Sequence, residues 1–451
     1  MKVLKFGGSS VGSPGSIRKV IQIVGNQSDQ CIIVVSAFKG ITDQIISTTG
    51  MANQRDSKYK QEIEAIRARH LNATDELISK DRSEAVKQTI NAMINEMSDL
   101  LYGIFLIGDL TPKTMDHILS FGERLSSFII TNAFDNAVCI DMRHFIKTND
   151  AFGNAVVNFE KTNKNIQELV AGKKGYFIAP GFIASNDNND ITTLGRGGSD
   201  YTAAIIASAI DAEMLEIWTD VDGFMTADPR RVNKAHVIKE MSYAEALELS
   251  HFGAKVVYTP TLHPAYNKNI PVKIKNTFNP DEDGTLISIS PGNHSISPIK
   301  GISSIDRICL VTLQGSGLPG VTGTSMRLFS ALAAEKINIV LITQASSEYS
   351  ISFAVSPEDA ERAREAIINE FELEITINKT IDVNIDLDLS VIAIVGEKMR
   401  HTPGISANLF SSLGRNGISV IATAQGSSEL NISVVIEQNV LNKALNVIHE
   451  G

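Results

Sequence analysis

Three segments of the chain place charged side chains beside glycines, a combination that suits phosphate chemistry. The first is the run Lys5-Phe6-Gly7-Gly8-Ser9-Ser10. It precedes a segment whose apolar residues have helical spacing, and Ser13 and Pro14 are a favourable N-cap and first residue for this helix. Backbone N–H groups at a glycine turn and a helix N-terminus, with the Lys5 ammonium, can hold phosphate oxygens. An ordinary strand-to-helix turn would explain the glycine pair equally well.

The second segment is TTLGRGGSD, Thr192 to Asp200, which precedes another apolar helical stretch. Its glycines let the backbone approach a ligand closely, while Arg196, Ser199 and Asp200 supply polar and charged groups. A flexible surface loop would account for the glycines but not for the charges beside them. This pattern therefore favours a binding site.

The third segment begins at Trp218, where WTDVDG ends an apolar run, and leads to Arg230. Parallel sheets bind ligands at the carboxyl ends of their strands, so Thr219, Asp220 and Arg230 are candidate nucleotide contacts, although an Asp-Gly turn is a competing explanation. Lys255 follows a predicted helix and is either a second phosphate cation or a solvated lysine. Phe121-Gly122-Glu123 is predicted to start a helix, where the dipole favours a glutamate regardless of function.

The composition excludes several classes of protein. The chain has 451 residues, which is enough for two or three domains. Its net charge is −10 and its Lys and Arg residues are not clustered, so nucleic-acid and membrane-surface partners are not expected. Cys31, Cys139 and Cys309 fit neither a disulfide framework nor a metal site, so a reducing cytoplasm is expected. No signal-peptide pattern and no apolar run of membrane length is present.

The elements that must position these segments belong to an α/β fold. Residues 1 to about 290 alternate β-rich runs such as VLKF, CIIVVSAF, YFIAPGFIA and LEIWTDV with amphipathic helical stretches, which predicts a largely parallel sheet covered by helices. The polar stretch between Asn53 and Leu101 has helical periodicity and is predicted to form a solvated helical pair.

A boundary near residues 289–300 precedes an internal repeat with an offset of 81 residues, as from Gly315 to Gly396. QASSE followed by ISFAV in the first copy corresponds to QGSSE followed by ISVVI in the second. Each copy predicts strand, helix, strand, strand, and the first continues into a helix, PEDAERAREAIINEF, and a strand, LEITIN. The expectation is a βαββαβ unit of the ferredoxin-like type, present twice.

Taken together, these motifs resemble those of aspartate kinases in the amino-acid kinase family, and the resemblance covers essentially the whole chain. The segments that carry it are KFGGSSV, VVSAFKGITD, SFGERLS, TTLGRGGSDYTA, WTDVDGF and FGAKVV. It implies a three-layer αβα kinase domain over residues 1–295 and two ACT regulatory domains over 305–383 and 384–451, with residues 299–304 adding a strand to the second. Met225 and Tyr258-Thr259 depart from the family pattern near the nucleotide.

The resemblance also implies roles for individual residues. Lys5, Gly7, Gly8 and Ser9 would hold the ATP phosphates, and Thr219, Asp220, Arg230 and Lys255 would contact the nucleotide. Aspartate would be bound by Ser36, Thr42, Glu123, Arg196, Ser199 and Asp200. Lys5, Asp200 and Lys255 would be catalytic, and Mg²⁺ would be held mainly by the ATP phosphates rather than by a protein metal site.

The activity so implied is phosphorylation of the aspartate side chain by MgATP, the first step toward lysine, threonine and methionine. Alternatives are a related enzyme that phosphorylates another acid such as glutamate, and an inactive amino-acid sensor. The ACT segments look most like those of bifunctional aspartate kinase–homoserine dehydrogenases, but the second activity is not expected of this chain.

Regulation and assembly are the remaining expectations. ACT sheets have edges that must be paired, so a homodimer or larger homo-oligomer through these domains is expected. Gln344 and Gln425 occupy equivalent positions in the two copies and are the candidate effector contacts. Because an uncharged amide suits a hydroxyl-bearing ligand, threonine is the favoured effector, with lysine as the alternative. A second explanation is that the two glutamines bind no effector and only satisfy backbone groups at the strand ends.

Overall fold

The computed structural model describes residues 1–27, 30–171, 175–253, 256–289, 297–344, 349–400, 402–426 and 428–450. It divides the chain into two compact units. The first comprises Met1–Phe224, Lys239–Tyr243 and Lys255–Gly292, and the second comprises Met225–Ile238, Ala244–Ala254 and Asn293–Gly451. Among the described residues, no helix is both long enough and apolar enough to cross a membrane.

An eight-stranded sheet forms the centre of the first unit, in the order β3-β4-β2-β1-β7-β9-β10-β8. All neighbouring pairs are parallel except β9 and β10, as the alternation of β-rich and helical segments predicts. The strands are β1 (Lys2–Phe6), β2 (Cys31–Val35), β3 (Ala137–Cys139), β4 (Tyr176–Pro180), β7 (Met214–Thr219), β8 (Glu240–Ser242), β9 (Val272–Asn276) and β10 (Thr285–Ser288). A separate hairpin joins β5 (Ile183–Ser185) to β6 (Ile191–Thr193).

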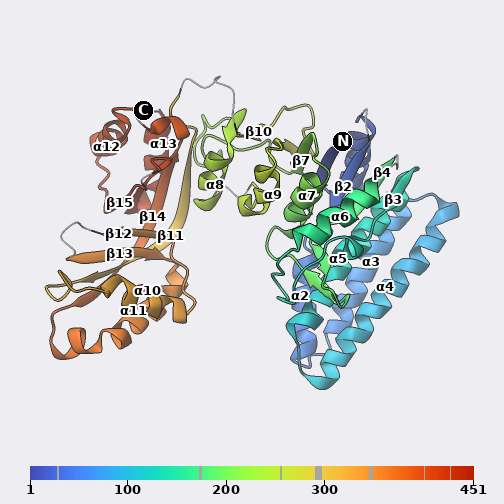
Figure 1. Ribbon diagram of the computed structural model, residues 1–451, viewed down its shortest axis with the longest axis horizontal. Coiled ribbons are helices and arrows are strands. Elements are labelled where there is room, and N and C mark those ends of the chain that lie inside the picture. The colour runs from blue at the N-terminus through green and yellow to red at the C-terminus, as the bar shows by residue number, and fades with distance from the viewer. Residues whose placement is uncertain are drawn as a thin grey trace. The chain divides into compact units, whose positions relative to one another are not determined.

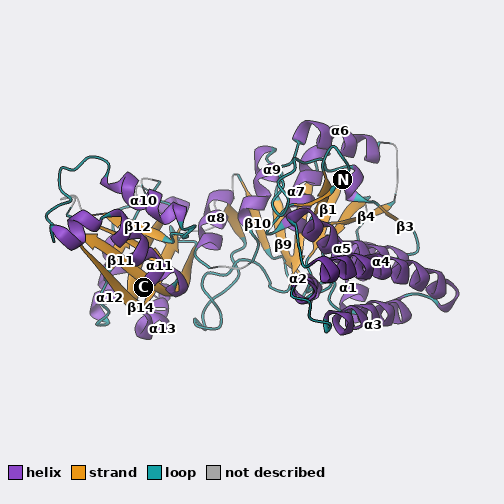
Figure 2. Ribbon diagram, turned by 90° about the horizontal axis from the view of Figure 1, so that it is seen from below, coloured by secondary structure: helices purple, strands orange, loops and turns teal. Residues whose placement is uncertain are grey.

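Helices cover this sheet on both faces, which gives three layers (Figure 2). One face packs against α1 (Pro14–Gly25), α2 (Ile41–Asn53), α3 (Tyr59–Leu77), α4 (Lys80–Ile107) and α5 (Pro112–Ala133). The other packs against α6 (Phe159–Val170), α7 (Gly198–Ala209) and the short α9 (His263–Asn267). The predicted helical pair is α3 and α4, and burial of its apolar stripe, such as Ile63, Ile66, Ile90 and Ile94, attaches it to the core.

The second unit contains a six-stranded sheet in the order β12-β13-β11-β14-β16-β15, with every neighbouring pair antiparallel. Its strands are β11 (Gly301–Gln314), β12 (Leu341–Gln344), β13 (Ser350–Val355), β14 (Asp382–Val395), β15 (Ala422–Ala424) and β16 (Asn431–Glu437). Helices α10 (Thr324–Ala334) and α11 (Pro357–Glu370) pack on the first copy of the repeat, and α12 (Ile405–Arg415) and α13 (Leu441–Glu450) on the second (Figure 1). Helix α8 (Tyr243–His251) falls at a boundary between the units.

The two copies share their long strands. In β11, residues 308–314 pair with 382–389 of β14, and residues 301–305 pair with 391–395. The helix predicted over PEDAERAREAIINEF is α11, but the strand predicted for LEITIN is wrong. Leu373–Ile377 forms a π-helical turn instead, and the strand begins at Asp382. The alternating apolar residues of LEITIN suit a strand, but the edge of β11 is paired by the segment that follows it.

Candidate active site

Four strand ends of the first unit meet along one edge of its sheet. The strands β1, β2, β4 and β7 are mutually parallel, so their carboxyl ends lie together. β1 leads into Gly7 and Gly8, β2 leads into Ser36, and β7 ends at Thr219. The glycine loop and two further candidate residues, Ser36 and Thr219, are thereby brought to one edge.

The glycine loop is fixed by backbone contacts to the neighbouring strand. Gly7 N–H donates to the Trp218 carbonyl of β7 (3.1 Å), and Ser10 and Val11 N–H groups both donate to the Gly7 carbonyl. A Cβ on Gly8 would lie 3.2 Å from the Ala37 carbonyl, so the loop passes close to the end of β2. Ser13 caps α1 by accepting a hydrogen bond from Ser16 N–H (3.2 Å), as predicted, and Pro14 starts the helix.

A buried ion pair lies beside this loop. The Lys5 ammonium is 2.6 Å from Oδ1 of Asp200, and each residue is only 8% exposed. Lys5 comes from β1 and Asp200 from the first turn of α7, whose N-cap, Gly197, has a φ of 72°. A Cβ on Gly7 would lie 3.5 Å from the Lys5 nitrogen, so the ammonium also lies against the glycine loop. Two segments that the sequence singled out separately are joined by this pair.

Glu123 is a third buried titratable side chain of the site. The prediction that it lies at a helix start is wrong, because α5 begins at Pro112 and Glu123 lies near its middle. Without a helix N-terminus to stabilise the carboxylate, burial dominates and raises the pKa of Glu123 from 4.5 to about 8, against the lowering effects of the Ala37 hydrogen bond and Lys5. Oε1 accepts from Ala37 N–H (3.2 Å), while Oε2 is buried with no hydrogen-bond partner.

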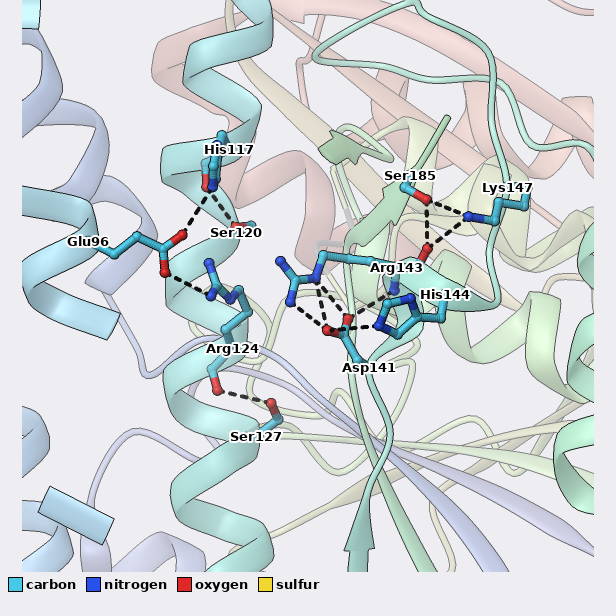
Figure 3. Close-up of polar contacts among 10 residues, drawn as sticks. All are labelled: Glu96, His117, Ser120, Arg124, Ser127, Asp141, Arg143, His144, Lys147 and Ser185. Atoms are coloured by element: carbon cyan, nitrogen blue, oxygen red, sulfur yellow. Dashed lines mark hydrogen bonds and ion pairs between the residues drawn. The ribbon is translucent and has the colours of Figure 1, made fainter. Parts of the chain in front are cut away.

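The position of Glu123 is fixed by contacts of α5 on two sides. Toward the site, Ser126 Oγ donates to the Ser36 carbonyl (2.8 Å), which ties α5 to the end of β2. Figure 3 shows the other side, where Arg124 and His117 both contact Glu96 of α4, at 3.2 and 3.4 Å. Sequence reasoning missed Arg124 and Glu96, because they are separated by 28 positions and carry no motif of their own.

The remaining predicted aspartate-binding residues differ in exposure. Arg196 is exposed, and its guanidinium carbon lies 5.4 Å from the centre of the Tyr258 ring. Ser199 and Thr42 are half-buried, in the first turns of α7 and α2. Gly181, at the end of β4, approaches Ser199 so closely that a Cβ there would lie 2.6 Å from the Ser199 side chain. A side chain at position 181 would therefore displace the start of α7.

The predicted nucleotide contacts are not all placed in the first unit. Thr219 ends β7 and the exposed Asp220 follows it, with Thr219 Oγ1 donating to Asp220 Oδ1 (3.3 Å). Arg230 belongs to the second unit, where its guanidinium pairs with Asp228 at 2.8 Å. Lys255 lies outside the described residues.

The candidate effector residues lie in the second unit. Gln344 is the last residue of β12, Gln425 follows β15, and both are exposed. Thr343 Oγ1 donates to the Thr423 carbonyl (2.8 Å), so the ends of these two strands lie side by side. The two edge strands of the sheet, one from each copy of the repeat, thus contact each other through Thr343 and Thr423, next to the candidate residues.

Across the described ranges, no group of three or more His, Cys, Asp or Glu side chains could hold a metal ion. The polar groups gathered at the sheet edge instead suit a substrate with several charges. The ammonium of Lys5 and the N–H groups of Gly8 and Ser9 suit phosphate oxygens, and the unpartnered oxygen of Glu123 suits a cation. Such a set can bind an anionic phosphate donor beside a zwitterionic acceptor.

Comparison with known proteins identifies two kinds of domain. The amino acid kinase family matches residues 1–276, and the ACT domain matches residues 311–371 and 392–451. The chain is 34% identical over 458 residues to the chloroplastic bifunctional aspartokinase/homoserine dehydrogenase 2 of Arabidopsis thaliana, an alignment that covers 99% of this chain and 50% of that protein. The chain therefore spans about half the length of the curated relatives it matches.

Solved structures match over the whole chain. The aspartate kinase of Clostridium acetobutylicum superposes with a TM-score of 0.85 at 26% identity, covering 100% of this chain and 99% of that one. E. coli aspartokinase III matches at 26% identity and the same coverage in two complexes. The complex with aspartate and ADP gives a TM-score of 0.81, and the complex with lysine and aspartate gives 0.82.

Proposed function

The chain belongs to the amino acid kinase family and carries ACT domains after its kinase domain, and on this basis we propose that it transfers the γ-phosphoryl group of MgATP to the side-chain carboxylate of L-aspartate. The products are 4-phospho-L-aspartate and ADP. We place the kinase domain at residues 1–295 and the ACT domains at 305–383 and 384–451. The complex of E. coli aspartokinase III with aspartate and ADP supports these substrates.

The observation that carries the proposal is the buried Lys5–Asp200 pair between the glycine loop and Glu123. In-line phosphoryl transfer involves little covalent chemistry by the protein and depends on positioning and charge neutralisation. An aspartate side chain, with a reference pKa of about 3.9, is already ionised at pH 7, so no general base is required. The barrier is the approach of one anion to another, which a buried ammonium lowers.

Each residue then has a defined task. Lys5 and the N–H groups of Gly8 and Ser9 bind the phosphate oxygens at the turn that Gly7 begins, and Asp200 holds the Lys5 ammonium in place at 2.6 Å. Oε2 of Glu123 binds the α-ammonium of aspartate, and the planar fork of Arg196 binds its α-carboxylate through two hydrogen bonds. Ser9, Ser36, Thr42 and Ser199 line the same edge, and Thr219, Asp220, Arg230 and Lys255 are assigned to the nucleotide. Mg²⁺ bound with ATP would neutralise charge on the phosphates and would be held mainly by their oxygens.

For regulation, we assign threonine as the effector, bound near Gln344 and Gln425. Both glutamines are exposed at the ends of β12 and β15, two strands that contact each other through Thr343 and Thr423, and their uncharged amides suit a neutral hydroxyl-bearing amino acid. Lysine is the second candidate, because E. coli aspartokinase III has been crystallised with lysine and aspartate. Inhibition requires the effector to bind the low-activity state more tightly than the active state.

An ATP-dependent hydroxamate assay tests the proposed reaction, because hydroxylamine traps an acyl phosphate as it forms. L-aspartate with MgATP should give hydroxamate, while L-glutamate should give much less. Hydroxamate from glutamate but not aspartate would show that the acceptor is misassigned, and ATP binding without hydroxamate from either acid would favour a sensor. Sedimentation at micromolar concentration tests assembly through the ACT sheets, for which a monomer would be the contrary result.

A further inference from the structure

A polar groove lies beside α1 on the face of the kinase sheet opposite the Lys5 side chain. Its volume is about 620 Å³, and its walls include Lys19 on α1, Lys2 on β1, Trp218 on β7, and Lys273 and Lys275 on β9. Lys5, Asp200 and Glu123 do not line it. The groove is therefore separate from the site described above.

The strands that form the groove floor are unusual for their place in the sheet. β7 and β9 are interior strands that pair with each other in parallel, and interior strands of a largely parallel sheet are normally covered on both faces and apolar throughout. On the opposite face they follow this rule, with Leu215, Ile217, Val272 and Ile274 buried. On the groove face the alternate positions are Glu216, Lys273 and Lys275. This face is built for contact with polar groups rather than for packing a helix.

The groove walls carry more positive than negative charge. They contain four lysines and two carboxylates, Glu216 and Asp281, within a chain of net charge −10. Lys2 pairs with Glu216 (3.4 Å), and Lys273 pairs with Asp283 (3.6 Å).

The other two ammonium groups have no carboxylate partner among the described residues. Lys19 lies 5.3 Å above the Phe278 ring. Lys275 lies 4.9 Å above the Trp218 ring and donates to the Pro280 carbonyl (3.0 Å). Two ammonium groups, one from α1 and one from β9, therefore remain available to an anion in this groove.

The groove floor is joined directly to the glycine loop. The Trp218 carbonyl accepts hydrogen bonds from Gly7 N–H (3.1 Å) and from Ser10 Oγ (3.2 Å). Ser10 Oγ also lies 2.7 Å from Thr277 Oγ1, and Thr277 lines the groove. The Phe6 ring, which precedes the loop, stacks on Trp218 at 5.9 Å between ring centres. A shift of Trp218 would therefore be transmitted to the loop.

We propose that this groove binds a small anion with several phosphate groups, and that binding alters the glycine loop through Trp218 and Thr277. Lysine ammonium groups act as flexible point charges that suit phosphate oxygens, and several of them around one cavity favour a multiply charged ligand over a single carboxylate. The binding site goes beyond the proposed kinase activity, and its occupancy can be measured without any turnover.

The test uses inorganic tripolyphosphate without Mg²⁺ as the probe. Trp218 is the only tryptophan of the chain, so its fluorescence reports on the groove, and calorimetry gives an independent dissociation constant. We expect saturable binding that weakens at least about ten-fold in the Lys19→Gln, Lys275→Gln double variant. Lys19→Gln alone, on the exposed surface of α1, should weaken binding without affecting folding. Lys268→Gln, which removes an exposed lysine paired with Asp211, is the matched control and should bind as the parent does.

Binding at the nucleotide site would produce a different pattern. If tripolyphosphate binds in the groove, Lys5→Ala should leave its affinity nearly unchanged. If the glycine loop binds it instead, affinity would fall in Lys5→Ala and would not fall in the Lys19→Gln, Lys275→Gln double variant. That second pattern, or an equal affinity of citrate and tripolyphosphate, would overturn the proposal. These outcomes do not depend on hydroxamate formation, so failure of the groove and failure of the kinase assignment are distinguishable.

Discussion

Aspartate binding should release a proton from Glu123. In the free protein this side chain is 4% exposed, Oε2 has no hydrogen-bond partner, and burial raises its pKa to about 8. At pH 7, one unit below that value, about nine molecules in ten carry the proton. If the α-ammonium of aspartate binds to Oε2, the carboxylate form is required, and the proton must leave.

The size of the effect follows from the same pKa. Since the ionised fraction of Glu123 rises from about one tenth at pH 7 to about one half at pH 8, the affinity for aspartate should rise about five-fold over this interval. Calorimetry in buffers of different ionisation enthalpy should give close to one proton released per aspartate at pH 7. At pH 8 the value should be about one half.

The control is Glu123→Gln, which keeps the side-chain shape but cannot titrate. It should bind aspartate more weakly and with a heat that does not depend on the buffer. Buffer-independent heat in the parent protein, or the same proton release in Glu123→Gln, would refute the assignment of Glu123 as the counter-ion of the α-ammonium.

Three further predictions concern other parts of the account. Because the folded pKa of Glu123 is raised, the free energy of unfolding without ligand should decrease as pH rises from about 4.5 to about 8, by roughly 1.4 kcal/mol per pH unit at most. Denaturant titrations of Glu123→Gln should lack this pH-dependent component. A parent protein with the same pH dependence as the variant would exclude the contribution of Glu123. Arg196→Lys keeps the charge and loses the planar fork, so steady-state kinetics should show a larger rise in KM for aspartate than for ATP, and the reverse order would assign Arg196 to the nucleotide. Gln344→Ala and Gln425→Ala should each weaken threonine inhibition with kcat nearly unchanged, whereas inhibition by lysine alone would show that the effector is misassigned.

The sequence predicts much of the site because its motifs are local. The run of apolar residues before Gly7 predicts β1, and Ser13-Pro14 predicts the start of α1. Parallel strand order then brings the Gly7 and Trp218 segments to one edge. What local patterns cannot give is the pairing of Lys5 with Asp200, since it depends on how α7 packs across β1.

Glu123 shows why the sequence analysis failed at one helix. Phe121-Gly122-Glu123 was predicted to start a helix, but it lies inside α5, where a Cβ on Gly122 would lie 3.0 Å from the Ala37 Cβ. The glycine is required by close contact between α5 and the segment after β2, a contact between residues far apart in sequence. The same limitation applies to LEITIN, whose alternation favours a strand although the long-range pairing of β11 selects residues from Asp382 onward.

The groove beside α1 was also not predicted. Lys2, Glu216, Lys273 and Lys275 lie in three separate strands, and each occurs singly among apolar residues. Only the sheet order places them on one face. Their alternation with buried residues on β7 and β9 was the available signal, because an interior parallel strand is expected to be apolar on both faces.

The turnover number of Lys5→Ala in the hydroxamate assay with L-aspartate and MgATP tests the central claim most directly. The account predicts a loss in kcat on the order of 10²–10³, as for removal of one preorganised group that stabilises developing charge, with the fold retained. A variant that turns over at the parent rate would contradict the claim that Lys5, held by Asp200 at the edge of the sheet, stabilises the transferred phosphoryl group.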